Sequence, residues 1–462
     1  MVDSQIVSEA VSEIVSKSVS STSIPANPST LDKDGSPIWR PLTQMKTALP
    51  PLAVKSGRGV YLELEDGRQI MDCISSWWVN LHGHGEPKIA EAIADQARKL
   101  EHVIFAGFTH EPAESLARRL LEKVPSHLER LFYSDNGSTA VEVALKLACQ
   151  YWINKGAPER RRFIGFECGY HGDTVGAMSV GGSSSFWSPF KNLMFELDIV
   201  PYPATFAGDT DCEIKERAVL SAIEKLFAAH EGAHAAIFIE PLIQGAGGMR
   251  MCRPEFLRQL QELAHQSQVL VIYDEVMTGF GRTGGFFACS KSLTSPDILC
   301  LSKGITGGFL PLAVTLTTEE IFTQFLSDDS SKTFFHGHSY TANPIACAAA
   351  NASLTLLENN TALFENMQAK HEALAQEYLF EHSMIKRFRV CGTVAAFDVV
   401  TSEGTNYFDD IGRLLREKFL QAGFLIRPLG NTVYLMPPYC IETEQLSSAY
   451  AAMARALDSC KC

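Results

Sequence analysis

The sequence lacks long apolar runs and an excess of positive charge. No run approaches the roughly 18 apolar residues that a membrane-spanning helix needs. The 40 basic residues stand against 53 acidic ones, so the formal net charge is −13. A mildly acidic chain argues against binding to nucleic acid or to an anionic membrane surface. We therefore expect no nucleic-acid partner and no membrane partner.

Cysteine pairs at metal-ligand spacing are also missing. The 12 cysteines are scattered, and many lie inside apolar segments, as Cys149, Cys300 and Cys347 do. Scattered cysteines in a long chain are typical of reduced, buried thiols in a cytoplasmic protein. We therefore expect a cytoplasmic location and no metal site.

Residues 1–36 lack aromatic side chains and are dominated by Ser and Val. They have neither the basic start and apolar core of a secretory signal nor the acid-poor composition of a transit peptide, since Asp3, Glu9 and Glu13 occur there. We expect a disordered or loosely ordered N-terminal extension.

The remainder of the 462-residue chain alternates short apolar runs with helical patterns, which indicates a globular protein of more than one domain. Residues 138–153 carry apolar side chains at helical spacing. The alternation predicts an α/β fold with a mostly parallel sheet covered on both faces, whose functional residues follow the carboxyl ends of the strands. Five runs are expected as buried strands: residues 130–135, 161–167, 235–243, 269–276 and 297–304.

The pattern changes after about residue 350, where two helical stretches precede further strands. This change indicates a smaller α+β domain. We expect residues 86–345 to form the large domain. Residues 37–85 would be the N-terminal part of the small domain, and residues 346–462 its C-terminal part.

Two charged residues end apolar strands. Lys303 is expensive to bury unless it is paired or covalently modified, and desolvation supplies the neutral amine that a Schiff-base nucleophile needs. It could instead be a lysine that extends to solvent. Asp274 needs a cationic partner, and a protonated pyridine nitrogen is one. Arg282 could also be that partner.

Two further segments fit a phosphorylated ring. Asn136, Gly137 and Ser138 stand where a strand meets a helix, and the N-terminus of a helix attracts phosphate, although a plain N-cap would explain the same residues. Tyr170, followed by His171, comes after a strand and could stack on a flat heterocycle, although it could equally be an ordinary loop aromatic.

The order and spacing of Gly-Ser, Tyr-His-Gly-Asp, Asp-Glu-Val and Ser-Lys-Gly resemble the class III aminotransferases of fold type I, over roughly residues 37–455. The resemblance implies a pyridoxal 5'-phosphate enzyme with a large cofactor-binding domain, a smaller α+β domain and a homodimer with shared active sites. Lys303 and Tyr170 would be catalytic, with Lys303 carrying the cofactor and moving protons. Asp274 would hold the pyridinium, Gly137 and Ser138 the phosphate, and Tyr170 would stack on the ring.

The resemblance also implies residues for the substrates. Trp77 would line the substrate channel, Arg427 would bind the distal carboxylate of the keto acid, Arg282 would be a second arginine of the site, and Glu240 a supporting carboxylate. From the neighbouring subunit, one loop would supply a substrate-binding residue and two cofactor-binding residues: Gly337, His338 and Ser339.

Within the family, several segments are similar to members that convert 8-amino-7-oxononanoate to 7,8-diaminononanoate in biotin biosynthesis. These are residues 37–46, 73–87, 169–180, 240–251 and 426–439. Leu42 departs from these members, because many that use S-adenosylmethionine have Tyr there. The resemblance implies S-adenosylmethionine as the amino donor, and the departure at Leu42 leaves lysine open as the alternative. Two rival functions also stay open: a class III enzyme for ornithine, acetylornithine or 4-aminobutyrate, and a non-catalytic binding or regulatory member of the fold.

Overall fold

The computed structural model describes residues 36–182, 185–400 and 410–460. The expected N-terminal extension therefore lies, apart from Ser36, outside the described residues. The chain divides into two units, Met1–Lys55 with Glu63–Arg68, and Ser56–Leu62 with Gln69–Cys462. In the described part of the first unit, Lys55 pairs with Glu63 at 3.0 Å. None of the helices in the described ranges combines the length and the hydropathy that a membrane-spanning segment needs.

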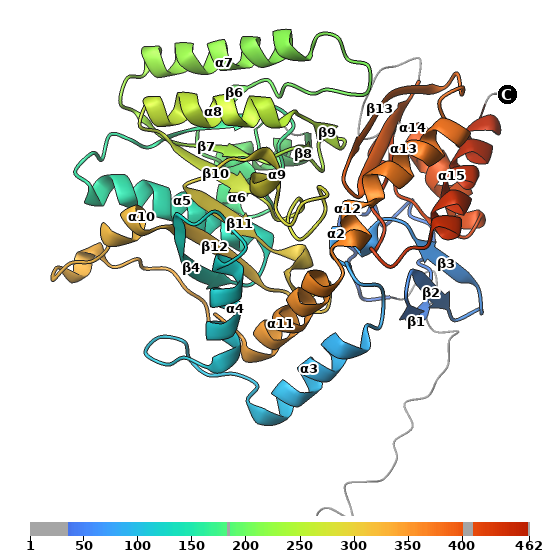
Figure 1. Ribbon diagram of the computed structural model, residues 1–462, viewed down its shortest axis with the longest axis horizontal. Coiled ribbons are helices and arrows are strands. Elements are labelled where there is room, and N and C mark those ends of the chain that lie inside the picture. The colour runs from blue at the N-terminus through green and yellow to red at the C-terminus, as the bar shows by residue number, and fades with distance from the viewer. Residues whose placement is uncertain (1–35, 183–184, 401–409, 461–462) are drawn as a thin grey trace, which may run out of the picture. The chain divides into compact units, whose positions relative to one another are not determined.

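A seven-stranded sheet forms the centre of the second unit (Figure 1). Only β12 runs antiparallel to its neighbours, and the other pairings are parallel. This confirms the predicted mostly parallel sheet, and all five expected strands are present. The order across the sheet is β4 (Leu128–Ser134), β12 (Ala313–Thr318), β11 (Ile298–Leu301), β10 (Leu270–Asp274), β7 (His234–Ile239), β5 (Arg162–Phe166) and β6 (Asp198–Val200).

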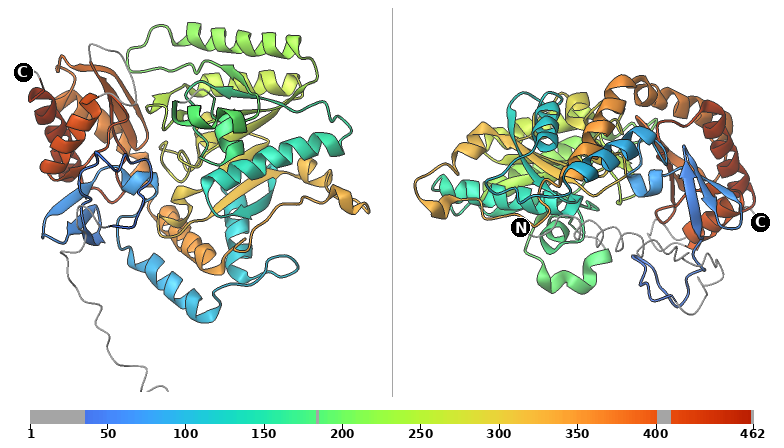
Figure 2. Two further views of the ribbon diagram at one scale, coloured as in Figure 1. Left: turned by 180° about the vertical axis from the view of Figure 1, so that it is seen from behind. Right: turned by 90° about the horizontal axis from the view of Figure 1, so that it is seen from below.

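Both faces of the central strands β7, β10 and β11 are buried, because successive residues along them are apolar and point to opposite faces. Val271 and Tyr273 point to one face and pack in the core that includes α8 (Pro254–Gln266). Ile272 points to the other face, in the core built on α5 (Gly137–Asn154), which confirms the helix expected over residues 138–153. The two views of Figure 2 and that of Figure 1 show α5 on the face opposite α8.

The parallel strands bring distant segments of the chain to one edge. Because β4, β5, β7, β10 and β11 point the same way, the residues that follow them meet beyond their carboxyl ends. The antiparallel β12 begins at this edge, since its Ala313 lies opposite Ser134 at the end of β4. The segment that precedes β12 therefore reaches the same place.

A second core supports the smaller α+β part. The antiparallel sheet of β13 (Ile385–Cys391), β14 (Val394–Val399) and β16 (Thr432–Leu435) packs with helices from the C-terminal part of the chain. Met71 of β3 (Gln69–Asp72) pairs with Phe424 of β15 (Phe424–Leu425) and shares this core. This confirms the predicted smaller α+β region, whereas the expected boundaries at residues 85 and 345 stay predictions. The helices of this smaller region are α13 (Met367–Tyr378), α14 (Asp410–Gln421) and α15 (Thr443–Asp458).

The remaining elements of the described residues are short strands, short helical turns and further helices. They are β1 (Val54–Arg58), β2 (Tyr61–Leu64), α2 (Ser75–Trp78), α3 (Pro87–Lys99), α4 (Glu111–Leu121), α6 (Val175–Val180), η2 (Ser185–Leu193), α7 (Cys212–Ala229), β8 (Ile243–Gln244), β9 (Arg250–Met251), α9 (Ala288–Ser292), η3 (Lys303–Thr306), α10 (Glu319–Thr323), η4 (Ser330–Lys332), α11 (Pro344–Asn359) and α12 (Ala362–Glu365).

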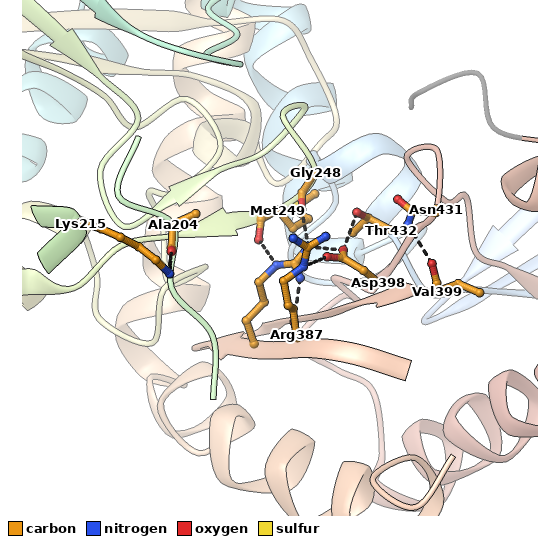
Figure 3. A network of polar contacts seen from close by, with 10 residues as sticks. Ala204, Lys215, Gly248, Met249, Arg387, Asp398, Val399, Asn431 and Thr432 are labelled. Atoms are coloured by element: carbon orange, nitrogen blue, oxygen red, sulfur yellow. Dashed lines mark hydrogen bonds and ion pairs between the residues drawn. The ribbon is translucent and has the colours of Figure 1, made fainter. Parts of the chain in front are cut away.

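A buried polar network ties the small sheet to the turn that precedes β9 (Figure 3). The guanidinium of Arg389 donates to the carbonyl oxygens of Gly248 and Met249, at 2.6 and 2.7 Å. Asp398 of β14 accepts from Arg389 at 2.9 Å and from Thr432 at 2.8 Å. The two cores are therefore joined by charge-assisted hydrogen bonds as well as by chain connections.

Candidate active site

A cavity of about 480 Å³ lies at the carboxyl edge of the large sheet. It is lined by the segments that follow β4, β5, β7, β10 and β11 and by the segment before β12. The fold therefore gathers at one place side chains from Trp78 to Leu312, which are up to about half of the chain apart in sequence. Six of the residues predicted for the site line this cavity: Gly137, Ser138, Tyr170, Glu240, Asp274 and Lys303.

Lys303 carries the amine of the cavity. It stands two residues after the last residue of β11 and has a left-handed backbone, with φ of 44°. Its Nζ lies 4.7 Å from the ring centroid of Trp78. Burial lowers the pKa of Lys303, an effect that the carboxylates of Asp274 and Glu240 partly oppose. The environment therefore favours the neutral, nucleophilic form of the amine more than water does.

Asp274 supplies a buried carboxylate at the end of β10. It is 4% exposed, and its Oδ2 lies 2.7 Å from Nδ1 of His171. Burial by itself lowers the pKa of His171, but the hydrogen bond to Asp274 and the charge of that carboxylate outweigh it and raise the pKa. The partner of Asp274 within the described residues is thus a histidine rather than Arg282, and the carboxylate still lines the cavity.

Glu240 follows β7 and holds two backbone segments around the cavity. Its Oε2 accepts from the backbone N–H of Tyr170 at 3.0 Å, and its Oε1 accepts from that of Gly245 at 2.9 Å. Burial raises the pKa of Glu240 to about 7. The ring of Tyr170 stacks on that of Trp187, with centroids 6.2 Å apart and 17° between the planes. Glu240 therefore supports the wall that presents Tyr170.

The N-terminus of α5 forms another part of the lining. Asn136 caps this helix, because its side chain accepts from the N–H of Thr139 at 3.1 Å. A Cβ atom on Gly137 would lie 2.7 Å from Cγ1 of Val276, so a larger residue would force the wall to move. Ser138 Oγ accepts from the N–H of Asp173 at 3.3 Å. A long helix whose first turn lines a cavity is a favourable seat for phosphate.

Trp77 and Arg427 lie together but outside the lining of this cavity. Trp77 is 37% exposed, and Cζ of Arg427 lies 4.9 Å from its ring centroid. Arg427 is half-buried and has no ion pair with any carboxylate of the described ranges. A cation held against an aromatic ring without a carboxylate partner is suited to an incoming anion.

Arg282 is 1% exposed, and its guanidinium forms hydrogen bonds to backbone carbonyl oxygens. Its guanidinium donates to the oxygens of Pro437 and Asn80, at 2.9 and 3.0 Å, and lies 5.0 Å from the ring of Tyr439. Burial lowers its pKa. In this arrangement Arg282 ties three segments together behind the cavity rather than lining it.

The loop that carries Gly337, His338 and Ser339 lies between η4 and α11 and does not line the cavity. Gly337 and Ser339 are exposed, and His338 is half-buried, with its Nδ1 accepting from the N–H of Tyr340 at 3.2 Å. One chain therefore does not bring these three residues to the other predicted site residues.

Among the lining residues that received no role from the sequence, Trp78 and His171 lie against predicted ones. Trp78 is 5% exposed and lies under the amine of Lys303, and His171 is the partner of Asp274. Both stand next to residues that were assigned, in the Trp-Trp and Tyr-His pairs. The signal was present, but which neighbour faces the cavity depends on local backbone direction.

The lining fits pyridoxal 5'-phosphate. A cavity of this size offers an amine at Lys303, a buried carboxylate at Asp274 and a helix N-terminus at Gly137 and Ser138. These are the partners that an aldehyde, a protonated ring nitrogen and a phosphate require. Tyr170 adds an aromatic wall.

Comparisons with known proteins agree with this fit. The family model Aminotransferase class-III matches residues 43–457. The adenosylmethionine-8-amino-7-oxononanoate aminotransferase of Synechococcus elongatus is 53% identical over 421 residues, which are 91% of this chain and 98% of that protein. The crystal structure of the enzyme of the same name from Methanocaldococcus jannaschii is 37% identical, with a TM-score of 0.84 over 91% of this chain and 97% of that one. A PLP-bound amine transaminase from an uncultivated Pseudomonas species is 30% identical, with a TM-score of 0.85 over 93% and 100%.

Proposed function

This chain belongs to the class III aminotransferases, and we propose that it converts 8-amino-7-oxononanoate to 7,8-diaminononanoate in biotin biosynthesis. The observation that carries the choice of substrate is the 53% identity, over 91% of the chain, to a protein named for that keto acid. The cavity around Lys303 and Asp274 supports the amino transfer, and the Trp77–Arg427 pair supports a substrate with a distal carboxylate.

The residues of the cavity have separate roles in the amino transfer. Bound pyridoxal 5'-phosphate supplies an aldehyde that captures amines and a ring that withdraws electrons. Nζ of Lys303 would hold the aldehyde, and its amine, whose pKa burial lowers, would move the proton at the α-carbon of the donor. Asp274 keeps the ring nitrogen protonated, Gly137 and Ser138 bind the phosphate, and Tyr170 covers the ring.

Arg427 binds the distal carboxylate of the keto acid. Its half-buried guanidinium has no ion pair among the described residues and is steadied by the ring of Trp77. A guanidinium can hold a carboxylate by two parallel hydrogen bonds, which fixes both the position and the orientation of the substrate. Arg282 acts indirectly, by holding the segments of Asn80 and Pro437 behind the cavity.

S-adenosylmethionine is the proposed amino donor, in keeping with the names of the similar proteins. Leu42, in the first unit of the chain, is 57% exposed and offers apolar surface but no hydroxyl. Lysine is the second candidate, because the departure at Leu42 removes a group that many S-adenosylmethionine-using members have. The two donors differ in bulk and in the cationic group of the side chain, which is a sulfonium in one and an ammonium in the other, so a direct comparison separates them.

The working enzyme is a cytoplasmic homodimer with shared active sites. Gly337, His338 and Ser339 complete the phosphate and substrate sites from the partner subunit, a role that their exposed loop and their position away from this chain's cavity support. The cysteines of the described residues are all free, which fits a reducing compartment.

A spectral titration tests the function against its rivals. The absorbance of the cofactor-loaded protein is followed while 7,8-diaminononanoate, S-adenosylmethionine, lysine, ornithine and 4-aminobutyrate are added singly. Loss of the original band with 7,8-diaminononanoate supports the proposal, and the donor that also removes it is the physiological one. Loss only with ornithine or 4-aminobutyrate indicates another class III activity, and no response to any amine indicates a non-catalytic member.

A further inference from the structure

Residues 75–78, which form α2, turn in the left-handed sense. Ser75, Ser76, Trp77 and Trp78 have φ angles of 52°, 45°, 72° and 77°. The ψ angles of Ser76 and Trp77 are 50° and 48°, so both residues lie in the left-handed helical region. Residues with a Cβ atom disfavour this region, and four in succession persist only where other contacts hold them.

Asp72 provides the central contact. Its side chain is fully buried, and its Oδ2 accepts from the hydroxyl of Ser76 at 2.7 Å and lies 3.0 Å from Nε2 of His84. Its Oδ1 accepts from the N–H of Ile74 at 3.1 Å. One carboxylate therefore fixes both the entry to the turn and its second residue.

Ser76 is the exposed end of this arrangement, and its hydroxyl is the link between the buried carboxylate and the residue that follows. That next residue is Trp77, whose ring lies against the guanidinium of Arg427. Trp78 is held by other groups, because its Nε1 donates to the hydroxyl of Tyr434 at 2.9 Å. The Asp72–Ser76 hydrogen bond therefore fixes mainly the position of Trp77.

We propose that Asp72 and Ser76 are positioning residues for the keto acid, because they hold the left-handed turn that keeps Trp77 against Arg427. The assignment rests on the proposed function, in which Arg427 binds the distal carboxylate. It adds a specificity element outside the cavity, built from a buried carboxylate and a strained backbone. If the turn relaxed, the ring would leave the guanidinium, and the guanidinium would lose its fixed direction.

Two substitutions at one position test the turn. Ser76→Ala and Ser76→Gly both delete the hydroxyl, but only alanine retains the Cβ atom that opposes a positive φ. We expect the KM of Ser76→Ala for 8-amino-7-oxononanoate to exceed that of Ser76→Gly by about tenfold, the ratio that such a backbone preference gives. The KM for the amino donor should be the same for both. Thermal unfolding of each variant checks that it is folded.

Ser76→Ala and Ser76→Gly in an Arg427→Ala background test whether the effect of the turn on substrate binding passes through Arg427. If Ser76 acts through Trp77 and Arg427, the difference between alanine and glycine should shrink to within about twofold when the guanidinium is absent. Asp72→Asn serves as a second variant, since it preserves volume but replaces one acceptor oxygen by a donor, and it should also raise the KM for the keto acid.

The outcomes are distinct. Equal KM values for Ser76→Ala and Ser76→Gly, or no change in Asp72→Asn, overturn the positioning role. A difference that persists without Arg427 overturns the route through the guanidinium. Wild-type protein that turns over a different keto acid and ignores 8-amino-7-oxononanoate overturns the proposed function, and this assignment with it.

Discussion

Nδ1 of His171 lies 2.7 Å from Oδ2 of Asp274, and both side chains are at least nine-tenths buried at the carboxyl edge of the large sheet. His171 follows β5 and Asp274 is the last residue of β10, and β7 separates these two strands. The hydrogen bond fixes the direction of the carboxylate, and the carboxylate raises the pKa of the imidazole. A carboxylate oriented in this way suits a protonated ring nitrogen.

The substitution Asp274→Asn should therefore separate binding from catalysis. The amide has nearly the same shape but cannot stabilise the ring proton, so we expect kcat/KM to fall on the order of 10²–10³-fold, the scale of losing one preorganised electrostatic partner. The cofactor should still bind, since the groups for its phosphate and aldehyde are unchanged. Steady-state kinetics with a parallel absorbance spectrum measures both. Activity within tenfold of wild type would contradict the role.

Gly137→Ala tests the close approach of the wall to α5. The added Cβ atom would lie 2.7 Å from Cγ1 of Val276. We expect a weaker affinity for the cofactor by about tenfold, because side chains at the phosphate seat must shift to relieve the overlap. The matched control is the double variant Gly137→Ala/Val276→Ala, which keeps the added Cβ atom but removes the two methyl groups that it would meet and should restore most of the affinity. Fluorescence titration of cofactor-free protein gives both affinities, and equal affinities for wild type and Gly137→Ala would refute the steric account.

Glu240→Gln should change the pH dependence of stability. Burial raises the pKa of Glu240 from 4.5 to about 7, so the folded state binds a proton that the unfolded state has released between these values. Stability contributed at this residue therefore falls as the pH rises from 4.5 to 7 and is level above that, by roughly 3 kcal/mol in all. Glutamine does not titrate. It should lose stability relative to wild type at pH 5, because one of the two backbone N–H groups loses its acceptor, and regain it at pH 8.

The measurement is the difference in unfolding free energy between wild type and Glu240→Gln at the two pH values. A difference that moves toward the variant at pH 8 supports the raised pKa. A difference that is independent of pH would show that Glu240 ionises normally.

Much of the site followed from the sequence because strand ends are easy to recognise. The apolar runs before Asp274 and Lys303 predicted buried strands, and helices between parallel strands bring carboxyl ends to one edge. Neither inference needs the strand order. The N-terminus of α5 followed from its cap and its helical spacing, which are also local.

Contacts between residues that are far apart in the sequence could not be predicted from it, because they depend on strand order and on loop direction. Arg282 was an open partner for Asp274, yet its guanidinium donates to the carbonyls of Pro437 and Asn80, which are distant in sequence. Asp274 meets His171 instead. No residue in the turn that ends at Trp78 is glycine, so nothing in the sequence indicated a left-handed backbone there.

Arg427→Ala should weaken the keto acid and leave the donor unaffected. Loss of a partly buried, bidentate partner for a carboxylate corresponds to roughly 2–5 kcal/mol, so kcat/KM for 8-amino-7-oxononanoate should fall by at least about thirtyfold. Arg427→Lys keeps the positive charge but not the paired N–H donors of the guanidinium, so its kcat/KM should lie between those of wild type and Arg427→Ala. Kinetics at a fixed donor concentration gives the values. A kcat/KM within twofold of wild type for Arg427→Ala would remove Arg427 from the carboxylate site.

Product formation is the direct test of whether this protein converts 8-amino-7-oxononanoate to 7,8-diaminononanoate. Purified, cofactor-loaded protein is incubated with 8-amino-7-oxononanoate and either S-adenosylmethionine or lysine, and 7,8-diaminononanoate is measured by mass spectrometry, with Lys303→Ala as the control. We expect the diamine with at least one of the two donors and none with the variant. Absence of the diamine from wild-type reactions, alongside turnover of ornithine, acetylornithine or 4-aminobutyrate, would contradict the claim.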